Sequence, residues 1–247
     1  MNLISLNEVQ STNTYLTQLI ESEKELEEYT IVDCYAQTKG RGQRGNSWES
    51  NPGENLSCSV LLYPSEVAHP FDLNIIVSLA VRDLLSEYIK NKEIWIKWPN
   101  DLLVGERKIA GILIENEWLG MEWKYSIVGV GLNVCQKRFG EYTPAATSFS
   151  IEGVGLPSSY KAWHNPLLEK LVNSIKDRRD QLLKDTKELR RIYHQHLLGY
   201  QRERKYRLPN GKEFFGIIQE VLPNGLLSVK TEEGISLYAF KEIVTLF

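Results

Sequence analysis

The sequence predicts an α+β fold, in which a mixed or antiparallel sheet with helices on one face is followed by a small domain of strands. Apolar strand-like runs dominate the middle of the chain, and stretches with helical spacing stand apart from them. Beyond residue 198 the composition changes, and short strand candidates alternate with turns that end in glycine. We therefore expect two domains, at 1–198 and 199–247.

The N-terminal elements flank a loop rich in glycine. A short strand at Leu3–Leu6 precedes Ser11-Thr12-Asn13, whose side chains suit the start of a helix that we expect to run to about Glu28. Strands are expected at Thr30–Ala36 and Leu56–Leu62, where β-branched and apolar residues gather. The segment between these two strands is long for a plain turn, which favours a functional lid.

The remaining elements follow from hydrophobic periodicity. A helix is expected at Leu73–Ile89, and a helical pattern typical of core packing extends from Pro157 to Leu198. Strands of the first domain are expected at Ile94–Lys97, Leu102–Val104, Ile109–Glu115 and Tyr125–Leu132. Strands of the second domain are expected at Lys205–Leu208, Phe214–Val221, Leu226–Thr231, Ile235–Tyr238 and Ile243–Phe247.

The composition argues against several classes of function. A net charge of −3 over 247 residues does not favour nonspecific nucleic-acid binding as the main activity. The three cysteines and four histidines lack metal-ligand spacing, and the cysteines are typical of a reduced compartment. The sequence has neither a signal-peptide pattern at its start nor an apolar window long enough to span a bilayer. We therefore expect a cytoplasmic protein without membrane contact.

The segment from Gly40 to Trp48 is the strongest functional signal. Its three glycines allow backbone amides to approach an anion, and Arg41 and Arg44 supply charged forks that match phosphate or carboxylate groups. Trp48 offers a flat surface on which a purine could stack. Taken alone, the segment could also be a mobile surface loop with solvated arginines.

Two further segments support a ligand site. Lys97-Trp98-Pro99-Asn100-Asp101 forms a turn before two apolar runs, so its polar side chains are delivered at strand ends. The second of these runs begins after Lys108. Farther along, Gly129 and Gly131 are spaced two apart on a predicted strand, which leaves one face free of side chains and lets a ligand lie against the backbone.

Taken together, these segments resemble the catalytic domain of the biotin protein ligases. The family's motifs read Gly-Arg-Gly-Arg-x-Gly-Arg-x-Trp, Lys-Trp-Pro-Asn-Asp, Arg-Lys-x-Ala-Gly-Ile-Leu-x-Glu and Gly-x-Gly-x-Asn. The similarity runs in order from about Ser11 to Asn133 and includes Gln37 just before the glycine loop. It implies a catalytic domain of the class II synthetase and biotinyl/lipoyl ligase type, followed by an SH3-like β-barrel.

The glycine loop departs from the family pattern at two positions. Gln43 and Asn46 stand where the family has arginine, so this loop carries less positive charge. Arg44 occupies a position that the family leaves variable. Arg41 is therefore the loop arginine that the resemblance marks most clearly.

The resemblance implies roles for individual residues. Lys108 and Arg41 are the expected catalytic residues, stabilising the charge that develops at phosphorus. Asp101 is a candidate ligand for the Mg²⁺ that accompanies ATP, although a Pro-Asn-Asp turn also uses aspartate for its own backbone hydrogen bonds. The residues expected to bind biotin are Ser11, Thr12, Asn13, Gln37, Gly40, Arg41, Gly42, Gln43, Lys108, Gly111 and Gly129. The residues expected to bind ATP or the adenylate are Arg41, Gly42, Gln43, Arg44, Gly45, Trp48, Asn100, Lys108 and Asn133.

The implied reaction is the ATP-dependent attachment of biotin to a lysine of a biotin carboxyl carrier protein domain, through biotinyl-5′-AMP. Two alternatives stay open. Lipoate or octanoate ligases and transferases share the fold and the acyl-to-lysine logic. The chain could also be a sensor of biotin or a nucleotide without turnover, although a sensor would not need the charge of Lys108.

The resemblance also bears on partners. Some family members carry a helix-turn-helix domain, for which the sequence has no room before Ser11, so we expect no binding to DNA. An exposed sheet edge could pair with a second subunit, giving a homodimer, or with the carrier domain, and the sequence does not choose between them.

Overall fold

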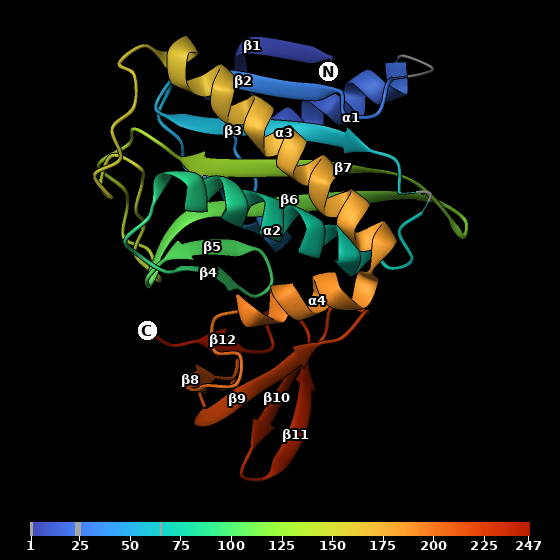
Figure 1. Cartoon of the computed structure of the whole chain (residues 1–247), viewed down its shortest axis with the longest axis vertical. Coiled ribbons are helices and arrows are strands. Elements are labelled where there is room, and N and C mark those ends of the chain that lie inside the picture. Colours follow the sequence, from blue (N-terminus) through green and yellow to red (C-terminus); the bar gives the residue numbers. More distant parts are fainter. Residues whose placement is uncertain (1, 23–25, 65) are drawn as a thin grey trace.

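A seven-stranded sheet forms the centre of the larger part of the molecule (Figure 1). The computed structural model describes residues 2–22, 26–64 and 66–247. The strand order is β1-β2-β3-β7-β6-β5-β4, and only the β1–β2 pair is parallel among the pairs of this sheet. The strands are β1 (Leu3–Val9), β2 (Ile31–Gln37), β3 (Asn55–Leu62), β4 (Ile94–Lys97), β5 (Asp101–Val104), β6 (Arg107–Leu119) and β7 (Glu122–Asn133).

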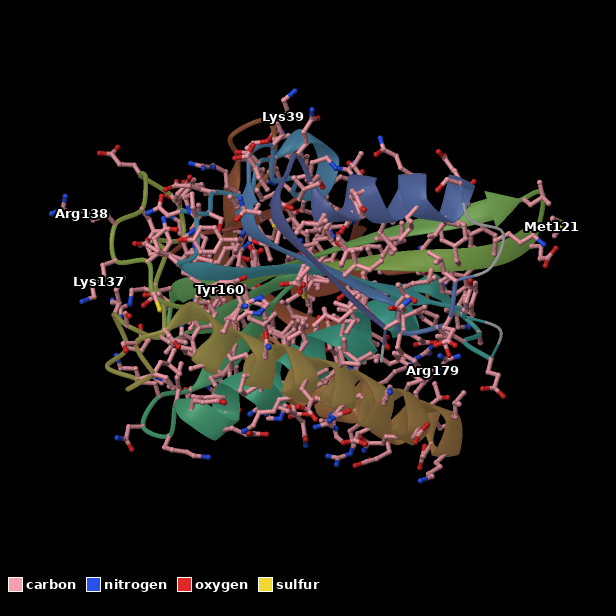
Figure 2. All side chains as sticks on the ribbon, turned by 90° about the horizontal axis from the view of Figure 1, so that it is seen from above. Lys39, Met121, Lys137, Arg138, Tyr160 and Arg179 are labelled. Carbon is pink, nitrogen blue, oxygen red and sulfur yellow. The ribbon has the colours of Figure 1, made fainter. Side chains whose placement is uncertain are left out.

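Helices lie on both faces of this sheet, as the view in Figure 2 shows. α2 (Pro70–Tyr88) and α3 (Tyr160–Lys184) cover one face and enclose the main apolar core, whereas the expectation of helices on one face alone does not hold for α1 (Thr12–Ser22). α1 lies on the opposite face, where Leu16 packs with residues of β2, β3 and β7. Because α1 covers only part of that face, the rest is open for a site.

The first helix is shorter than the sequence suggested. α1 ends at Ser22, and residues 26–28 are not helical, so the expected end near Glu28 was wrong; residues 23–25 lie outside the described part of the chain. Tyr29 has a φ of 62°, which no right-handed helix can contain. Glu28 pairs instead with Arg179 of α3, so a tertiary contact fixes this turn.

The C-terminal strands form a separate five-stranded antiparallel sheet in the order β11-β10-β9-β8-β12. They are β8 (Glu203–Arg207), β9 (Glu213–Val221), β10 (Leu227–Thr231), β11 (Gly234–Tyr238) and β12 (Val244–Thr245). This sheet is consistent with an SH3-like domain, and the predicted α+β class is confirmed. α4 (Thr186–Gln195) lies between the two sheets in the view of Figure 1.

One set of contacts between the two parts involves the turn before β5. The Trp98 Nε1–H donates to the carbonyl oxygen of Gly225, 3.1 Å away, and the indole meets the ring of Phe240 edge-on. The C-terminal sheet is thereby held close to the segment that carries the Lys-Trp-Pro-Asn-Asp motif. No helix in the described ranges has the length and apolar character needed to cross a membrane.

Candidate active site

A cavity of about 580 Å³ opens on the sheet face that α1 leaves uncovered. The start of α1, the glycine loop, strands β3, β5, β6 and β7, and Phe240 of the C-terminal part all contribute to its wall. Residues that the sequence singled out on separate segments are therefore brought together. Those on the wall are Ser11, Thr12, Asn13, Gln37, Arg41, Gly42, Gln43, Gly45, Trp48, Asn100, Asp101, Lys108, Gly111, Gly129 and Asn133.

One end of the cavity carries a network of uncharged hydrogen bonds, which we call the neutral end (Thr12, Asn13, Gln37 and Ser59). The Thr12 amide N–H donates to Gln37 Oε1 over 2.9 Å, so a side chain from β2 satisfies an amide at the start of α1. Ser59 Oγ lies 2.7 Å from Thr12 Oγ1 and 2.5 Å from Asn13 Oδ1. Thr12, Asn13 and Gln37 line the cavity, and the fully buried Ser59 holds Thr12 and Asn13 in place.

The two glycines of β7 make room for the protein's own side chains. A Cβ at Gly129 would lie 2.4 Å from Asn13 Oδ1, and a Cβ at Gly131 would lie 2.3 Å from Trp48 Cε2. The bare strand face expected from the sequence exists, and Asn13 and Trp48 lie against it. In the sheet, Gly129 is opposite Ser59 and Gly131 is opposite Ser57.

The other end of the cavity carries charge, and we call it the charged end (Lys97, Asp101 and Lys108). Lys108 Nζ lies 2.6 Å from Asp101 Oδ1, and Lys97 Nζ lies 3.2 Å from Asp101 Oδ2. Burial alone would raise the pKa of Asp101, but the ammonium groups of Lys108 and Lys97 outweigh it and hold that pKa below its ordinary value. Asp101 is thus an ionised counter-ion between two lysines.

Trp48 connects the charged end to the glycine loop. The Lys108 ammonium lies 5.6 Å from the centroid of the Trp48 ring, within the range of a cation–π contact. A Cβ at Gly111 would meet Trp48 Cζ3 at 3.2 Å and Lys108 Cε at 3.4 Å, so glycine lets both side chains approach β6.

The glycine loop folds back on itself as a narrow hairpin. The Gly42 N–H donates to the Asn46 carbonyl over 2.7 Å, and the Trp48 N–H donates to the Gly40 carbonyl over 2.9 Å. Gly40 has no room for a side chain, because a Cβ there would lie 2.3 Å from the Trp48 carbonyl oxygen. Gln43–Gly45 form a single 3₁₀ turn. The side chain of Arg44, a predicted nucleotide ligand, lies outside what the structure describes.

Arg41 reaches from this loop to β6. Its Nη2 lies 2.6 Å from Glu115 Oε2, and the same carboxylate oxygen accepts a hydrogen bond from Asn13 Nδ2 at 2.8 Å. Arg41 therefore has a defined position at the cavity wall.

Asn100 and Asn133 use their side-chain amides to hold the backbone around the cavity. Asn100 Nδ2 donates to the Ile112 carbonyl over 2.7 Å, and Asn133 Nδ2 donates to the Thr147 carbonyl over 2.9 Å. Both still line the cavity, but these contacts already give each of them a structural role.

Sequence reasoning missed several residues of the wall. Ser57 is 4% exposed, lines the cavity, and its hydroxyl has no hydrogen-bond partner among the described residues. The Trp48 indole N–H is likewise buried without a partner. Polar residues at alternate positions of an otherwise apolar strand were a signal for Ser57 and Ser59. Phe240 gave no local signal, because it reaches the cavity from the C-terminal part of the chain, between β11 and β12.

The donor set does not form a metal centre. Among the described residues, no group of three or more histidine, cysteine, aspartate or glutamate side chains is placed to hold an ion. Both oxygens of Asp101 are already engaged by lysine ammonium groups. The cavity therefore combines hydrogen-bonding groups for a polar ligand with fixed positive charge for an anion.

Comparisons with known proteins agree with this geometry. Residues 6–133 match the model of the biotin/lipoate A/B protein ligase family. The chain is 31% identical over 134 residues to the bifunctional ligase/repressor BirA of Escherichia coli, covering 54% of this chain and 40% of that protein. It is 29% identical over 223 residues to a biotin–[acetyl-CoA-carboxylase] ligase of Mycobacterium tuberculosis, covering 88% and 79%.

A solved structure extends the likeness to both parts of the fold. The biotin protein ligase of Aquifex aeolicus in complex with biotin and ATP superimposes with a TM-score of 0.78 at 28% identity, covering 99% of this chain and 98% of that one. The chain spans between 40% and 63% of the length of the BirA relatives from Escherichia coli, Salmonella typhimurium and two Bacillus species. Since the family model covers just over half of the residues and the resemblance noted in the motifs is confirmed, this chain belongs to the biotin/lipoate A/B protein ligase family.

Proposed function

We propose that this protein attaches biotin to a lysine of a biotin carboxyl carrier protein domain, through biotinyl-5′-AMP. The observation that carries the proposal is one cavity with a neutral hydrogen-bonding end and a lysine-rich end. A polar ring fits the first end, and a carboxylate next to a triphosphate fits the second. The solved relative from Aquifex aeolicus holds biotin and ATP, which supports both substrates here.

In the first step the biotin carboxylate attacks the α-phosphorus of ATP, and pyrophosphate leaves. Negative charge develops at phosphorus, and fixed cations placed beforehand stabilise it without reorganisation. Lys108 and Arg41 take that role at the cavity wall, and Gly42 and Gly45 let the loop backbone lie next to them. The ion pair with Asp101 orients Lys108.

In the second step the neutral amine of the carrier lysine attacks the acyl carbon, and AMP leaves. The amine then loses a proton to solvent, giving an amide. Lys108 steadies the carbonyl oxygen while the carbon is tetrahedral. Closure of the Gly40–Trp48 loop would keep water away from the mixed anhydride.

The remaining predicted residues divide between the two substrates. We assign Ser11, Thr12, Asn13, Gln37, Gly111 and Gly129 to biotin, and Gln43, Trp48, Asn100 and Asn133 to the nucleotide side, each next to the cavity. Mg²⁺ enters with ATP as part of that substrate, because Asp101 is occupied by Lys97 and Lys108. The earlier proposal of Asp101 as its ligand would need those pairs to break.

We also propose a domain boundary after residue 198, where Gly199 adopts a φ of 87° between the last helical segment and β8. The carrier domain as partner, a cytoplasmic location and a homodimer stay predictions. The outer edge of β1 is the free edge of the larger sheet among the described residues, because β4 bonds to residues 196–198.

Lipoate or octanoate activation is the second candidate, since the family includes lipoate ligases. The neutral end disfavours it. A site built to hydrogen-bond a polar ring discriminates strongly against an alkyl chain, because its buried polar groups would be left unpaired. Ser57 is such a group, because it lines the cavity, is 4% exposed, and its hydroxyl has no partner among the described residues.

The proposal is tested by pyrophosphate release with Mg·ATP and biotin, lipoate or octanoate in parallel, with the acyl-adenylate identified by mass spectrometry. Release with biotin alone is expected. Release with lipoate or octanoate instead would assign the other branch of the family, and biotin binding without any release would favour a sensor. Addition of a purified carrier domain then tests transfer to lysine.

A further inference from the structure

Glu115 of β6 connects Asn13 and Arg41, two side chains of the cavity wall. Its Oε2 accepts one hydrogen bond from Asn13 Nδ2, at 2.8 Å, and another from Arg41 Nη2, at 2.6 Å. Asn13 belongs to α1 and Arg41 to the glycine loop, so one carboxylate oxygen connects three segments far apart in sequence.

The connection continues into the neutral end. Asn13 is 3% exposed, and its Oδ1 lies 2.5 Å from Ser59 Oγ while its Nδ2 points to Glu115. Gly129 leaves no space on the other side of Asn13. Any ligand that contacts the amide of Asn13 therefore acts on a group that cannot move without affecting Glu115.

Stability does not explain the pair with Arg41. The side chains of Arg41 and Glu115 are 42% and 37% exposed, and exposed ion pairs contribute little to folding. The guanidinium presents five N–H donors, and the Glu115 contact leaves most of them for an anion in the cavity. The contact with Glu115 therefore orients Arg41 and leaves guanidinium N–H donors available for a ligand.

We propose that Glu115 is a positioning residue that couples occupancy of the neutral end to the placement of Arg41 for the nucleotide. The inference rests on the proposed function, because it takes biotin and ATP as the two ligands. Its consequence is that each ligand binds more tightly when the other is present, through the path Ser59–Asn13–Glu115–Arg41. By linkage the two enhancements are equal.

Calorimetry on the full chain tests the coupling with biotin and a non-hydrolysable ATP analogue, alone and together. In the wild-type protein each ligand is expected to tighten the other by about 5-fold or more. Glu115→Gln keeps an acceptor for Asn13 but removes the charge that holds Arg41. In this variant, the factor by which one ligand tightens the other should fall close to 1. Each ligand alone should still bind with an affinity within about 3-fold of that of the wild-type protein.

Glu117→Gln is the matched control, because Glu117 lies two residues further along the same strand, is exposed, and is not on the cavity wall. It should leave the coupling unchanged. Steady-state kinetics give the second readout. Glu115→Gln should raise the KM for ATP at saturating biotin, and Glu115→Asp, which keeps the charge, should give a KM closer to that of the wild-type protein.

The outcomes distinguish a failure of the proposed function from a failure of the positioning role of Glu115. No binding of biotin by the wild-type protein would overturn the proposed function. Binding of both ligands with coupling that Glu115→Gln leaves intact, or a loss that Glu117→Gln reproduces, would overturn the positioning role.

Discussion

The neutral and charged ends of the cavity differ in how they hold their side chains. At the neutral end, Thr12, Asn13 and Ser59 hold one another through uncharged hydrogen bonds, and the nearest charge is the Glu115 carboxylate that accepts from Asn13. At the charged end, Lys97 and Lys108 share the buried carboxylate of Asp101. The comparison indicates that the first end selects a ligand by geometry, whereas the second supplies charge to a reaction. Strand β6 carries Lys108 of the charged end and Glu115, which accepts a hydrogen bond from Asn13 of the neutral end, so one strand connects the two ends.

The largest effect on turnover is expected from removing a positive charge at the charged end. Lys108→Ala should lower the rate of biotin-dependent pyrophosphate release by about 10²–10³-fold, as for loss of one preorganised group that stabilises developing charge. Biotin affinity, measured by calorimetry, should change little. Lys124→Ala is the control, since Lys124 is an exposed lysine of β7 paired with Glu122. Equal losses of binding and turnover would mean that the two ends are not functionally distinct.

Crowding the neutral end should act on binding instead. In Gly129→Ala the new methyl group would lie 2.4 Å from Asn13 Oδ1, and overpacking of this kind costs about 1–3 kcal/mol. We expect biotin affinity to fall by about 10-fold or more, because each 1.4 kcal/mol is a factor of ten. Gly155→Ala, where a methyl group meets nothing within 4 Å, should bind biotin normally. Normal binding by both variants would remove Asn13 from the biotin site.

Two serines on one strand face sharpen the description of the neutral end. Ser59 has partners, so Ser59→Ala should lower the free energy of unfolding by about 0.5–1.5 kcal/mol. The buried Ser57 hydroxyl has none, so Ser57→Ala should leave the ligand-free protein as stable or more stable. If biotin supplies the missing partner, Ser57→Ala should weaken biotin binding by about 2- to 10-fold. Denaturant unfolding with and without biotin measures the stability of each variant and its stabilisation by biotin. A Ser57→Ala protein that is less stable than wild type without biotin would show that this hydroxyl has a partner in the ligand-free protein.

The smallest effect is expected from a group outside both ends. Burial, followed by the neighbouring Arg82, lowers the pKa of His196 from 6.5 to about 4. The unfolded chain therefore binds more protons between these values, and the stability that neutral His196 contributes is lost as the pH falls from 6.5 towards 4. His196→Gln should flatten the fall of melting temperature in that window. His69→Gln, at an exposed position before α2, should leave the slope as in wild type, and an unchanged slope in both would exclude His196.

The sequence predicted the parts of this molecule that local patterns encode. Alternation and apolar runs placed β2, β3, β6 and β7 within a few residues, because their side chains must meet two buried or half-buried faces. The end of α1 was missed, since the turn at Tyr29 depends on the pair between Glu28 and Arg179, which are far apart in sequence.

At the site, residue types were predictable but their partners were not. The glycines of β7 indicated a bare strand face, yet nothing local showed that Asn13 and Trp48 would lie on it. The turn before β5 indicated a useful carboxylate, and only the folded arrangement shows Asp101 between two lysines. Such contacts depend on long-range geometry that one sequence does not carry.

Trp98 lies where the two parts of the molecule meet, so it matters for chimaeric proteins in which one part is exchanged. Its indole N–H donates to the Gly225 carbonyl and its ring meets Phe240, which lines the same cavity as Lys108. A graft that exchanges residues 199–247 for those of a relative would alter the wall of the catalytic cavity, even though the splice point lies far from it along the chain. A chimaera should therefore exchange Trp98 together with the C-terminal sheet.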